Sequence, residues 1–366
     1  MRVHIGHHFY GAGNMGDDLM LAGFLQALPA NAVDLKFSCC SPFDIVSQRQ
    51  RFPQIEWLPY SPEVRQTAIA NSDCWLGLGD TPFQSDSGEW FIDHLADEAL
   101  WCKQHQLPMW FLGVGVNNRE VFDLPQTKFL LDCVEGIWSR DVISANCIAD
   151  YFPLSKIRLG ADLANIYLRH RAKNLNYIAR EMSIGLCLHF EDRAMFDIPM
   201  LEIAILNVPD RDFAWLIQEV RMLDFSEHCL YDMFSDQIKQ RLEIREPHYA
   251  QASIEELLNI WGRPDVAVSS RYHAGLIQAW SGGRIALVAR NQKLRGLAEQ
   301  LDCPIIESVM EQGQLDTALD IAVQIEPQRL FTLAELAESS VLEWLEAARC
   351  IAKNSQAPSL TNKHTE

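Results

Sequence analysis

Short apolar segments alternate with amphipathic, helix-like stretches along most of the chain. In the first half the apolar segments of strand length, each followed by a polar or glycine-containing turn, are residues 3–5, 33–39, 74–78, 109–114, 136–138 and 157–159. Continuous apolar runs separated by helical patterns are typical of parallel strands that helices cover on both faces. The first half is therefore predicted to be one α/β domain, residues 1–168.

The same alternation resumes in the second half. We expect strands at residues 183–190, 227–231, 266–269 and 284–288, and amphipathic helices at 212–223, 236–243, 254–261 and 293–301. They predict a second α/β domain, residues 183–329, joined to the first by a basic, amide-rich linker at 169–182. Residues 330–353 have the periodicity of a helix that packs back on the body, and the polar residues 354–366 are expected to form a flexible tail.

Composition limits the classes of protein to consider. The chain has 366 residues, 48% hydrophobic and 22% charged, which suits a soluble protein too long for one core. Acidic residues outnumber basic ones by 49 to 31, so a nucleic-acid partner is disfavoured and an anionic ligand needs a local basic pocket. The ten cysteines lack metal or redox spacing, and no signal peptide or transmembrane segment is recognised. We expect a cytoplasmic protein, with peripheral association at the inner membrane face left open.

Residues 269–275 combine more reactive groups than any other segment. Ser270, Arg271, Tyr272 and His273 follow a buried strand and precede an apolar helix. Ligands of open α/β sheets bind at such strand ends, where the helix N-terminus also favours anions. The segment therefore predicts an anion-binding site, with Arg271 and His273 at the mouth of a groove between the domains.

A glycine-rich loop follows the first strand. Its three glycines in residues 11–16 match G-x-G-x-x-G, the pattern of dinucleotide-binding folds. Two features disfavour a dinucleotide: the second strand ends without the expected acidic residue, and Asp17 and Asp18 at the helix start would repel a pyrophosphate. Asp17 is interpreted mainly as a helix cap. For Asp18 a cap and a functional role toward a sugar hydroxyl are equally favoured.

Polar side chains also follow other predicted strands. Arg140 either pairs with Asp141 at a helix cap or reaches a ligand in the cleft. Asp162 is interpreted as a cap. His189, at the end of the first strand of the second half, is either structural or faces the cleft.

Two further segments suggest binding functions. The loop around Asp80 continues through small polar residues to Trp90 and Phe91, which suits either carbohydrate recognition or an ordinary crossover loop. His7 and His8 invite a metal hypothesis, but neighbouring strand residues point to opposite faces, so no metal site is predicted.

Together these segments resemble the polysaccharide pyruvyl transferase family. The matching segments are residues 10–18, 113–116, 139–141, 160–162 and 270–274, in the order in which they occur in that family. The resemblance implies two Rossmann-like domains that face each other across a cleft, as in GT-B glycosyltransferases. It further implies phosphoenolpyruvate as the donor and a sugar, either free or lipid-linked, as the acceptor. No other cofactor is expected, and the oligomeric state stays open.

The resemblance also implies roles for individual residues. In the family, the Arg and His of an Arg-x-His segment contact phosphoenolpyruvate, which carries over to Arg271 and His273. We assign catalysis to His273 and Asp18, donor binding to Arg271, Tyr272, Ser270, His189 and Arg140, and acceptor binding to Asn14, Asp17 and Asp80. The chain departs from the family at residues 77–80, where a glycine-rich run is common, and at His189, where Arg is frequent.

Three functions are compatible with these features. The leading hypothesis is transfer of a pyruvyl group, as a ketal, to a sugar of a cell-surface polysaccharide or glycolipid. The alternatives are a GT-B-type nucleotide-sugar glycosyltransferase, whose diphosphate Arg271 would hold, and a binding protein that has kept the fold without catalysis.

Overall fold

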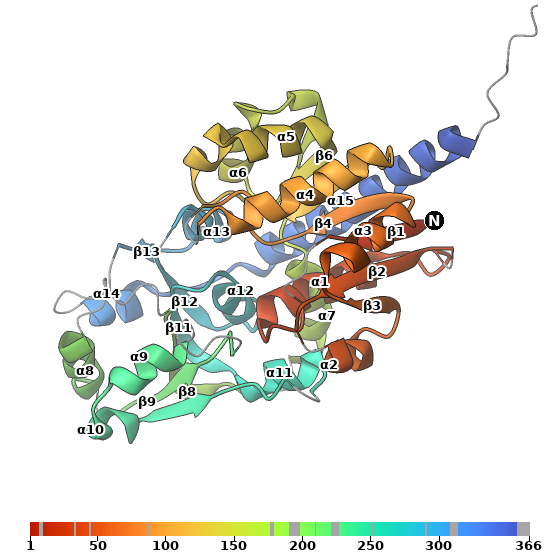
Figure 1. The fold of residues 1–366 in the computed structure, drawn as a ribbon. Coiled ribbons are helices and arrows are strands. Elements are labelled where there is room, and N and C mark those ends of the chain that lie inside the picture. The colour runs from red at the N-terminus through yellow and green to blue at the C-terminus, as the bar shows by residue number, and fades with distance from the viewer. Residues whose placement is uncertain are drawn as a thin grey trace, which may run out of the picture.

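Two α/β domains, each built on a parallel sheet, make up the computed structural model of the chain (Figure 1). It describes residues 1–6, 10–32, 34–43, 45–85, 88–175, 179–189, 198–208, 210–220, 227–249, 252–289, 291–307 and 314–356. The tail predicted at 354–366 lies mostly outside these residues. Among the helices described, none combines the length and apolar character needed to cross a membrane.

The N-terminal sheet has the strand order β3-β2-β1-β4-β5-β6-β7, and all its pairs are parallel. Its strands are β1 (Arg2–Ile5), β2 (Lys36–Ser41), β3 (Ile55–Pro59), β4 (Cys74–Leu78), β5 (Met109–Val114), β6 (Val134–Ser139) and β7 (Ile157–Leu159). Its helices are α1 (Met15–Ala27), α2 (Ile45–Arg51), α3 (Pro62–Ala70), α4 (Trp90–Gln104), α5 (Pro125–Cys133), α6 (Val142–Ala149) and α7 (Ala164–Leu175). Every residue of the inner strands β4 and β5 is buried, because helices cover both faces of the sheet.

The C-terminal sheet has the order β10-β9-β8-β11-β12-β13, with β14 added antiparallel to β12. Its strands are β8 (Glu181–Cys187), β9 (Asp212–Leu216), β10 (Leu242–Arg245), β11 (Pro264–Ser269), β12 (Arg284–Val288), β13 (Ile305–Ile306) and β14 (Val323–Gln324). Its helices are α8 (Ile198–Leu206), α9 (Glu227–Met233), α10 (Asp236–Lys239), α11 (Ile254–Ile260), α12 (Tyr272–Trp280), α13 (Gln292–Leu301) and α14 (Gln314–Ile321). The predicted pair of Rossmann-like domains is thereby confirmed.

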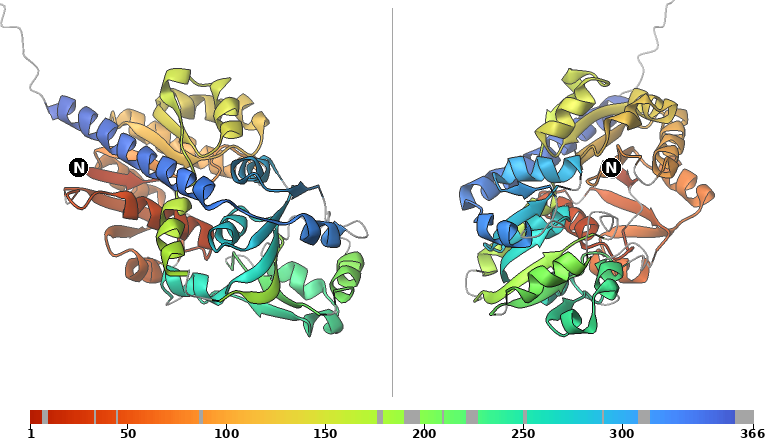
Figure 2. Two further views of the ribbon diagram at one scale, coloured as in Figure 1. Left: turned by 180° about the vertical axis from the view of Figure 1, so that it is seen from behind. Right: turned by 90° about the vertical axis from the view of Figure 1, so that its left-hand side faces the viewer.

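One apolar core runs through both domains. It joins α1, α7 and α12 to the last helix, α15 (Pro327–Gln356), whose Trp344 packs edge-on against Phe24 of α1. Figure 2 shows α15 lying along the N-terminal domain, so the last helix packs back on the body as predicted. A hydrogen bond from Trp280 of α12 to Asn165 of α7 (2.8 Å) adds a polar link between the domains. The two domains therefore share an interior.

Several predicted elements differ from the structure. Residues 212–216 form strand β9 rather than the start of a helix, and residues 227–231 lie in helix α9 rather than in a strand. The predicted helix at 236–243 ends at Lys239, after which β10 begins, and β3 was not predicted. Helix α1 begins at Met15 instead of Leu19, and α7 extends to Leu175, into the segment predicted as a linker.

Candidate functional site

The candidate site lies where helix α12 meets helix α1. Each follows a strand near the centre of its own sheet, β11 and β1 respectively, so the carboxyl ends of the two sheets face one another. Arg271 is the N-cap residue of α12, and His273 lies in its first turn. Gly16, in the first turn of α1, packs directly on His273, and a Cβ atom at Gly16 would overlap the imidazole. Residue 16 must therefore lack a side chain for the helices to approach this closely.

His273 belongs to a compact polar cluster with Asp162, Arg140 and Tyr272. The Asp162 Oδ2 atom lies 3.4 Å from His273 Nε2 and 3.8 Å from Arg140 Nη1. The Arg140 guanidinium stacks over the Tyr272 ring at 4.5 Å and donates to Thr81 Oγ1 at 3.2 Å. The cluster combines a guanidinium, an imidazole, a carboxylate and a phenol from the facing ends of both sheets.

Several polar atoms of the cluster have unused hydrogen-bonding capacity. Within the described part of the chain, Tyr272 OH is buried without a hydrogen-bond partner, and the buried Arg140 Nε, Asp162 Oδ2 and His273 Nε2 atoms have ion-pair contacts at 3.4–3.8 Å but no hydrogen bond of good geometry. Buried polar groups are nearly always satisfied, and an unsatisfied group in a native fold calls for an explanation such as a ligand. These atoms are suited to receive a small polar ligand.

The charge state of Asp162 follows from its neighbours. Burial alone would raise its pKa, but His273, Arg140 and the backbone N–H of Ala164 outweigh burial and hold the pKa below the usual value. Asp162 Oδ1 also accepts a hydrogen bond from that N–H at 3.0 Å. The carboxylate therefore caps the start of α7, as predicted, and also contacts the imidazole.

Arg271 and His273 do not lie at the mouth of an open groove, as the sequence had suggested. Arg271 is 8% exposed and His273 is 7% exposed. Arg271 Nη2 lies 2.6 Å from Glu219 Oε2, and its Nε lies 2.9 Å from Glu227 Oε1. Burial and the neighbouring Glu219 raise the pKa of Glu227, which Arg271 opposes. The guanidinium thus has two carboxylates beside it, and its charge is already compensated.

The segment that carries Glu219 also ties the two domains together. Residues 218–220 run antiparallel to residues 13–15: Gln218 O accepts from Met15 N at 3.1 Å, and Val220 N donates to Gly13 O at 3.0 Å. The Gln218 amide donates to Asn14 Oδ1 and accepts from the backbone N–H of Ala274. We call residues 218–220 the interdomain strap. It connects the glycine loop, Arg271 and α12.

The glycine loop is capped by a different residue from the one predicted. Asn14 is the N-cap of α1, and its side chain accepts from Gly16 N at 3.0 Å, so the interpretation of Asp17 as the cap is wrong. Asp17 and Asp18 are both buried in the first turn of this helix. Asn14 thus has a structural role at the strap.

Asp18 forms a buried ion pair with Arg51 of α2. The Arg51 Nη1 atom lies 2.9 Å from Asp18 Oδ2, and Gln48 donates to the other carboxylate oxygen at 3.3 Å. Arg51 also donates to the backbone carbonyls of Tyr249 and Ala252, which belong to the second domain. Burial raises the pKa of Asp18 to about 6, although Arg51 and Gln48 lower it. Arg51 therefore forms a further polar link between the domains, besides the Trp280–Asn165 hydrogen bond and the strap.

The other predicted residues lie around the same edge. Ser270 Oγ accepts from the backbone N–H of His189 at 2.8 Å, so these two buried residues connect the ends of β11 and β8. Asp141 caps α6 through Ser144, and its Oδ2 atom also lies 3.6 Å from Arg140 Nε, so the predicted Arg140–Asp141 pair at the helix cap is present and Arg140 links it to the polar cluster. Asp80 follows β4 in a left-handed backbone conformation, with φ of 57°.

The metal hypothesis receives no support from what can be described. His7 and His8 lie outside the described residues. Within the described part of the chain, no three His, Cys, Asp or Glu side chains are grouped to hold a metal ion.

The sequence analysis did not identify Glu219, Glu227 and Arg51 as residues of the site, and it interpreted Asp162 only as a helix cap. Glu219 and Glu227 lie in segments whose secondary structure was assigned wrongly, so they could not be placed at a strand end. Arg51 ends a short helix and carries no local signal. Asp162 did have a signal, because it follows a strand at the same sheet edge as Arg140.

Comparisons with known proteins agree with this architecture. A family model described as polysaccharide pyruvyl transferase matches residues 14–277, which include every residue of the polar cluster. No curated protein matches the chain.

Solved structures resemble the fold at low sequence identity. A putative UDP-N-acetylglucosamine 2-epimerase from Listeria monocytogenes is 12% identical, with a TM-score of 0.62 over 98% of both chains. UDP-GlcNAc 2-epimerase from Neisseria meningitidis, bound to UDP-GlcNAc, is 13% identical, with a TM-score of 0.63 over 95% of this chain and 100% of that one. Anabaena Alr3699/HepE, in complex with UDP and glucose, is 9% identical, with a TM-score of 0.54 over 97% and 99%. At these identities the likeness shows a shared GT-B-like fold.

Proposed function

Because the chain belongs to the polysaccharide pyruvyl transferase family, we propose that it transfers a pyruvyl group from phosphoenolpyruvate to two hydroxyls of a sugar, forming a ketal. The acceptor is part of a cell-surface polysaccharide or glycolipid, or a lipid-linked precursor of one. The reaction takes place in the cytoplasm or at the inner membrane face, and phosphoenolpyruvate is the only co-substrate.

The observation that carries the proposal is the placement of His273 between the two domains, 3.4 Å from Asp162 and beside Arg140. Ketal formation begins with proton transfer to the methylene carbon of phosphoenolpyruvate, which becomes the methyl group. His273 is the proton donor, and the Asp162 carboxylate stabilises its protonated form. Arg140 and Arg271 are the cations that can hold the carboxylate and phosphate of the donor.

The remaining steps balance without a further reagent. One sugar hydroxyl attacks the electron-poor C2 atom, the phosphate leaves with its bonding electron pair, and the second hydroxyl closes the ketal. Of the two hydroxyl protons released, one restores His273 and the other leaves with phosphate. Asp18, whose pKa burial raises to about 6, is suited to take up one of these two hydroxyl protons, once it separates from Arg51, and to pass it on to the phosphate.

Donor binding requires one change at Arg271. Its two carboxylate neighbours repel a phosphoenolpyruvate anion, so Glu219 must leave the guanidinium before the donor can pair with it. His189 occupies the position where family members often have Arg, so this chain relies on Arg140 and Arg271 for the donor.

A second candidate is a nucleotide-sugar glycosyltransferase. It is favoured by the likeness in fold to proteins solved with UDP-GlcNAc or with UDP and glucose. In that case the diphosphate takes the place of phosphoenolpyruvate at Arg271. A binding protein without catalysis is the third candidate, and the compensated charge of Arg271 favours it.

Product analysis distinguishes the candidates. Wild-type protein is incubated with phosphoenolpyruvate and a panel of galactosides, glucosides and mannosides, and the products are examined by NMR for a new ketal methyl signal and for free phosphate. His273→Gln should abolish both, whereas His105→Gln, at the exposed C-terminal cap of α4, should leave them unchanged. Thermal stabilisation by UDP- or GDP-sugars without any response to phosphoenolpyruvate would favour the glycosyltransferase instead.

A further inference from the structure

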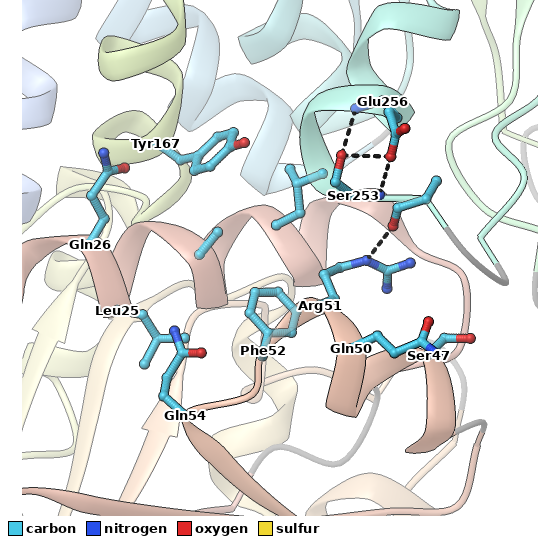
Figure 3. Close-up of a pocket in the computed structure, with 13 residues that line it drawn as sticks. Leu25, Gln26, Ser47, Gln50, Arg51, Phe52, Gln54, Tyr167, Ser253 and Glu256 are labelled. Carbon is cyan, nitrogen blue, oxygen red and sulfur yellow. Dashed lines mark hydrogen bonds between the residues drawn. The ribbon is translucent and has the colours of Figure 1, made fainter.

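A groove of about 500 Å³ lies between the two domains, and Arg51, the partner of Asp18, is part of its wall. Figure 3 shows its walls: Leu25 and Gln26 from α1, Gln50 and Arg51 from α2, and Ser253 at the start of α11. Its volume lies within the range of small-molecule sites, which often occur between domains. The groove exists only while both domains are in place, because each contributes a wall.

The groove is close to neutral in charge. The Arg51 guanidinium is compensated by Asp18. The Glu256 carboxylate accepts hydrogen bonds from Ser253, through its N–H at 2.7 Å and its hydroxyl at 2.8 Å, as part of the capping box of α11. The two charged side chains that line the groove are of opposite sign and are both already engaged. The surroundings, in a chain of net charge -18, also disfavour an anion.

The remaining polar groups of the lining are amides, a phenol and the Ser47 hydroxyl. The side chains of Gln26, Gln50 and Gln54 each offer a donor and an acceptor, and Tyr167 offers a ring and a hydroxyl. The buried Phe52 ring adds an apolar surface. A sugar ring presents an apolar face of C–H groups and a rim of hydroxyls that both donate and accept. Amides around aromatic rings match that combination.

The position of the groove relates it to the reacting site. Helix α1 contacts His273 through Gly16 and lines the groove from Ala22 onward. Six residues of α-helix span about 9 Å. The groove therefore begins about 9 Å along α1 from the turn that contacts His273, and an acceptor that reaches both must pass the Asp18–Arg51 pair.

We propose that this groove binds the non-reacting units of an uncharged oligosaccharide acceptor. The inference rests on the proposed function, because it names the acceptor class of that reaction. It assigns Gln50, Tyr167 and Phe52 a role in acceptor length selection and leaves donor binding to the cluster around His273.

The test measures saccharide binding without phosphoenolpyruvate, so it does not depend on turnover. Saturation-transfer NMR is recorded for galactobiose, mannobiose and cellobiose, and for the matching methyl monosaccharides, with wild type, Gln50→Trp and Gln104→Trp. Gln50 and Gln104 are both exposed helical glutamines, but only Gln50 lines the groove, so the second variant controls for an added surface indole.

The expected result is that at least one disaccharide binds the wild type and Gln104→Trp, more tightly than its monosaccharide. Filling the groove by Gln50→Trp should weaken that binding about tenfold or more. Absence of disaccharide binding to the wild type, or equal binding to Gln50→Trp, overturns the inference. Because the ketal methyl assay is read separately, disaccharide binding without pyruvyl transfer contradicts the proposed function alone.

Discussion

Replacing Glu219 tests the anion-binding role of Arg271 most directly. Arg271 contacts both Glu219 and Glu227, at 2.6 and 2.9 Å. The Glu227 carboxylate also accepts hydrogen bonds from the backbone N–H groups of Gln218 and Glu219, at 3.0 and 3.1 Å. Replacing Glu227 would therefore disturb the strap itself. Glu219→Gln keeps the shape of the side chain, removes one negative charge and leaves Arg271 paired with Glu227. It is the milder of the two changes.

The size of the effect follows from the geometry. Two unit charges about 4 Å apart interact by about 4 kcal/mol at an effective dielectric constant of about 20. In the wild type, Glu219 moves away from Arg271 when phosphoenolpyruvate binds, but it still repels the bound anion. We take this remaining repulsion as half of the full interaction energy, about 2 kcal/mol. Phosphoenolpyruvate should therefore bind Glu219→Gln about thirtyfold more tightly than the wild type.

The assay is a thermal melt across a phosphoenolpyruvate titration, from which Kd is obtained. The control is Glu338→Gln on α15, which removes the same charge from an ion pair with Arg169 of α7 (2.6 Å). Equal Kd values for the wild type and both variants would show that Glu219 does not compete with the donor for Arg271.

Three further predictions concern the domain interface. Arg51→Met should lower the free energy of unfolding, measured by urea denaturation, by about 3 kcal/mol, because it leaves the buried Asp18 carboxylate unpaired and removes hydrogen bonds to the second domain. An unchanged midpoint and slope of the urea transition would contradict this. The pKa of Asp18 in the folded state is raised to about 6, so between about pH 4 and about pH 6 the folded protein binds a proton that the unfolded chain releases. The free energy of unfolding should therefore fall as the pH rises through this range. Asp18→Asn should remove up to about 3 kcal/mol of that fall, measured by denaturation across the same pH range. Gly16→Ala should lower the free energy of unfolding by roughly 1–3 kcal/mol, because the added methyl group overlaps with His273, although helix propensity alone favours Ala. In the control Gly136→Ala, the methyl group meets its neighbours at ordinary contact distances and should have a smaller effect in the same denaturation experiments.

The strands buried on both faces could be predicted from the sequence. Cys74–Leu78, Met109–Val114 and Arg284–Val288 were predicted with the bounds that the structure shows, because helices cover the sheets and leave few polar positions in these strands. The bounds of Ile157–Leu159 were also predicted, although this edge strand is largely exposed. Edge strand β3 was missed, since Glu56 is exposed and Pro59 ends the strand. Its apolar signal is correspondingly weak.

The errors in the second domain have a common cause. Phe213 to Ile217 is a short apolar run that fits a buried strand and a helix equally well, and the apolar positions that follow it favoured the helix. The next element was then assigned as a strand, although Glu227 begins a helix and uses its carboxylate to hold the strap. Local patterns do not report such contacts between segments.

The candidate site was predicted in part. Arg140 and His273 were placed at strand ends from the chain alone, and the structure brings them together through Asp162. Compensation of Arg271 by Glu219 could not be predicted, because the two residues are 52 positions apart and meet only after both strands have joined the sheet.

Helix α15 contributes the fully buried Trp344 to the interior beside Phe24 of α1. The first half of the chain therefore lacks one of its largest interior side chains until α15 has been synthesised. Before then, the apolar side chains of α1 and α7 that α15 covers are exposed to solvent or to other partners during translation.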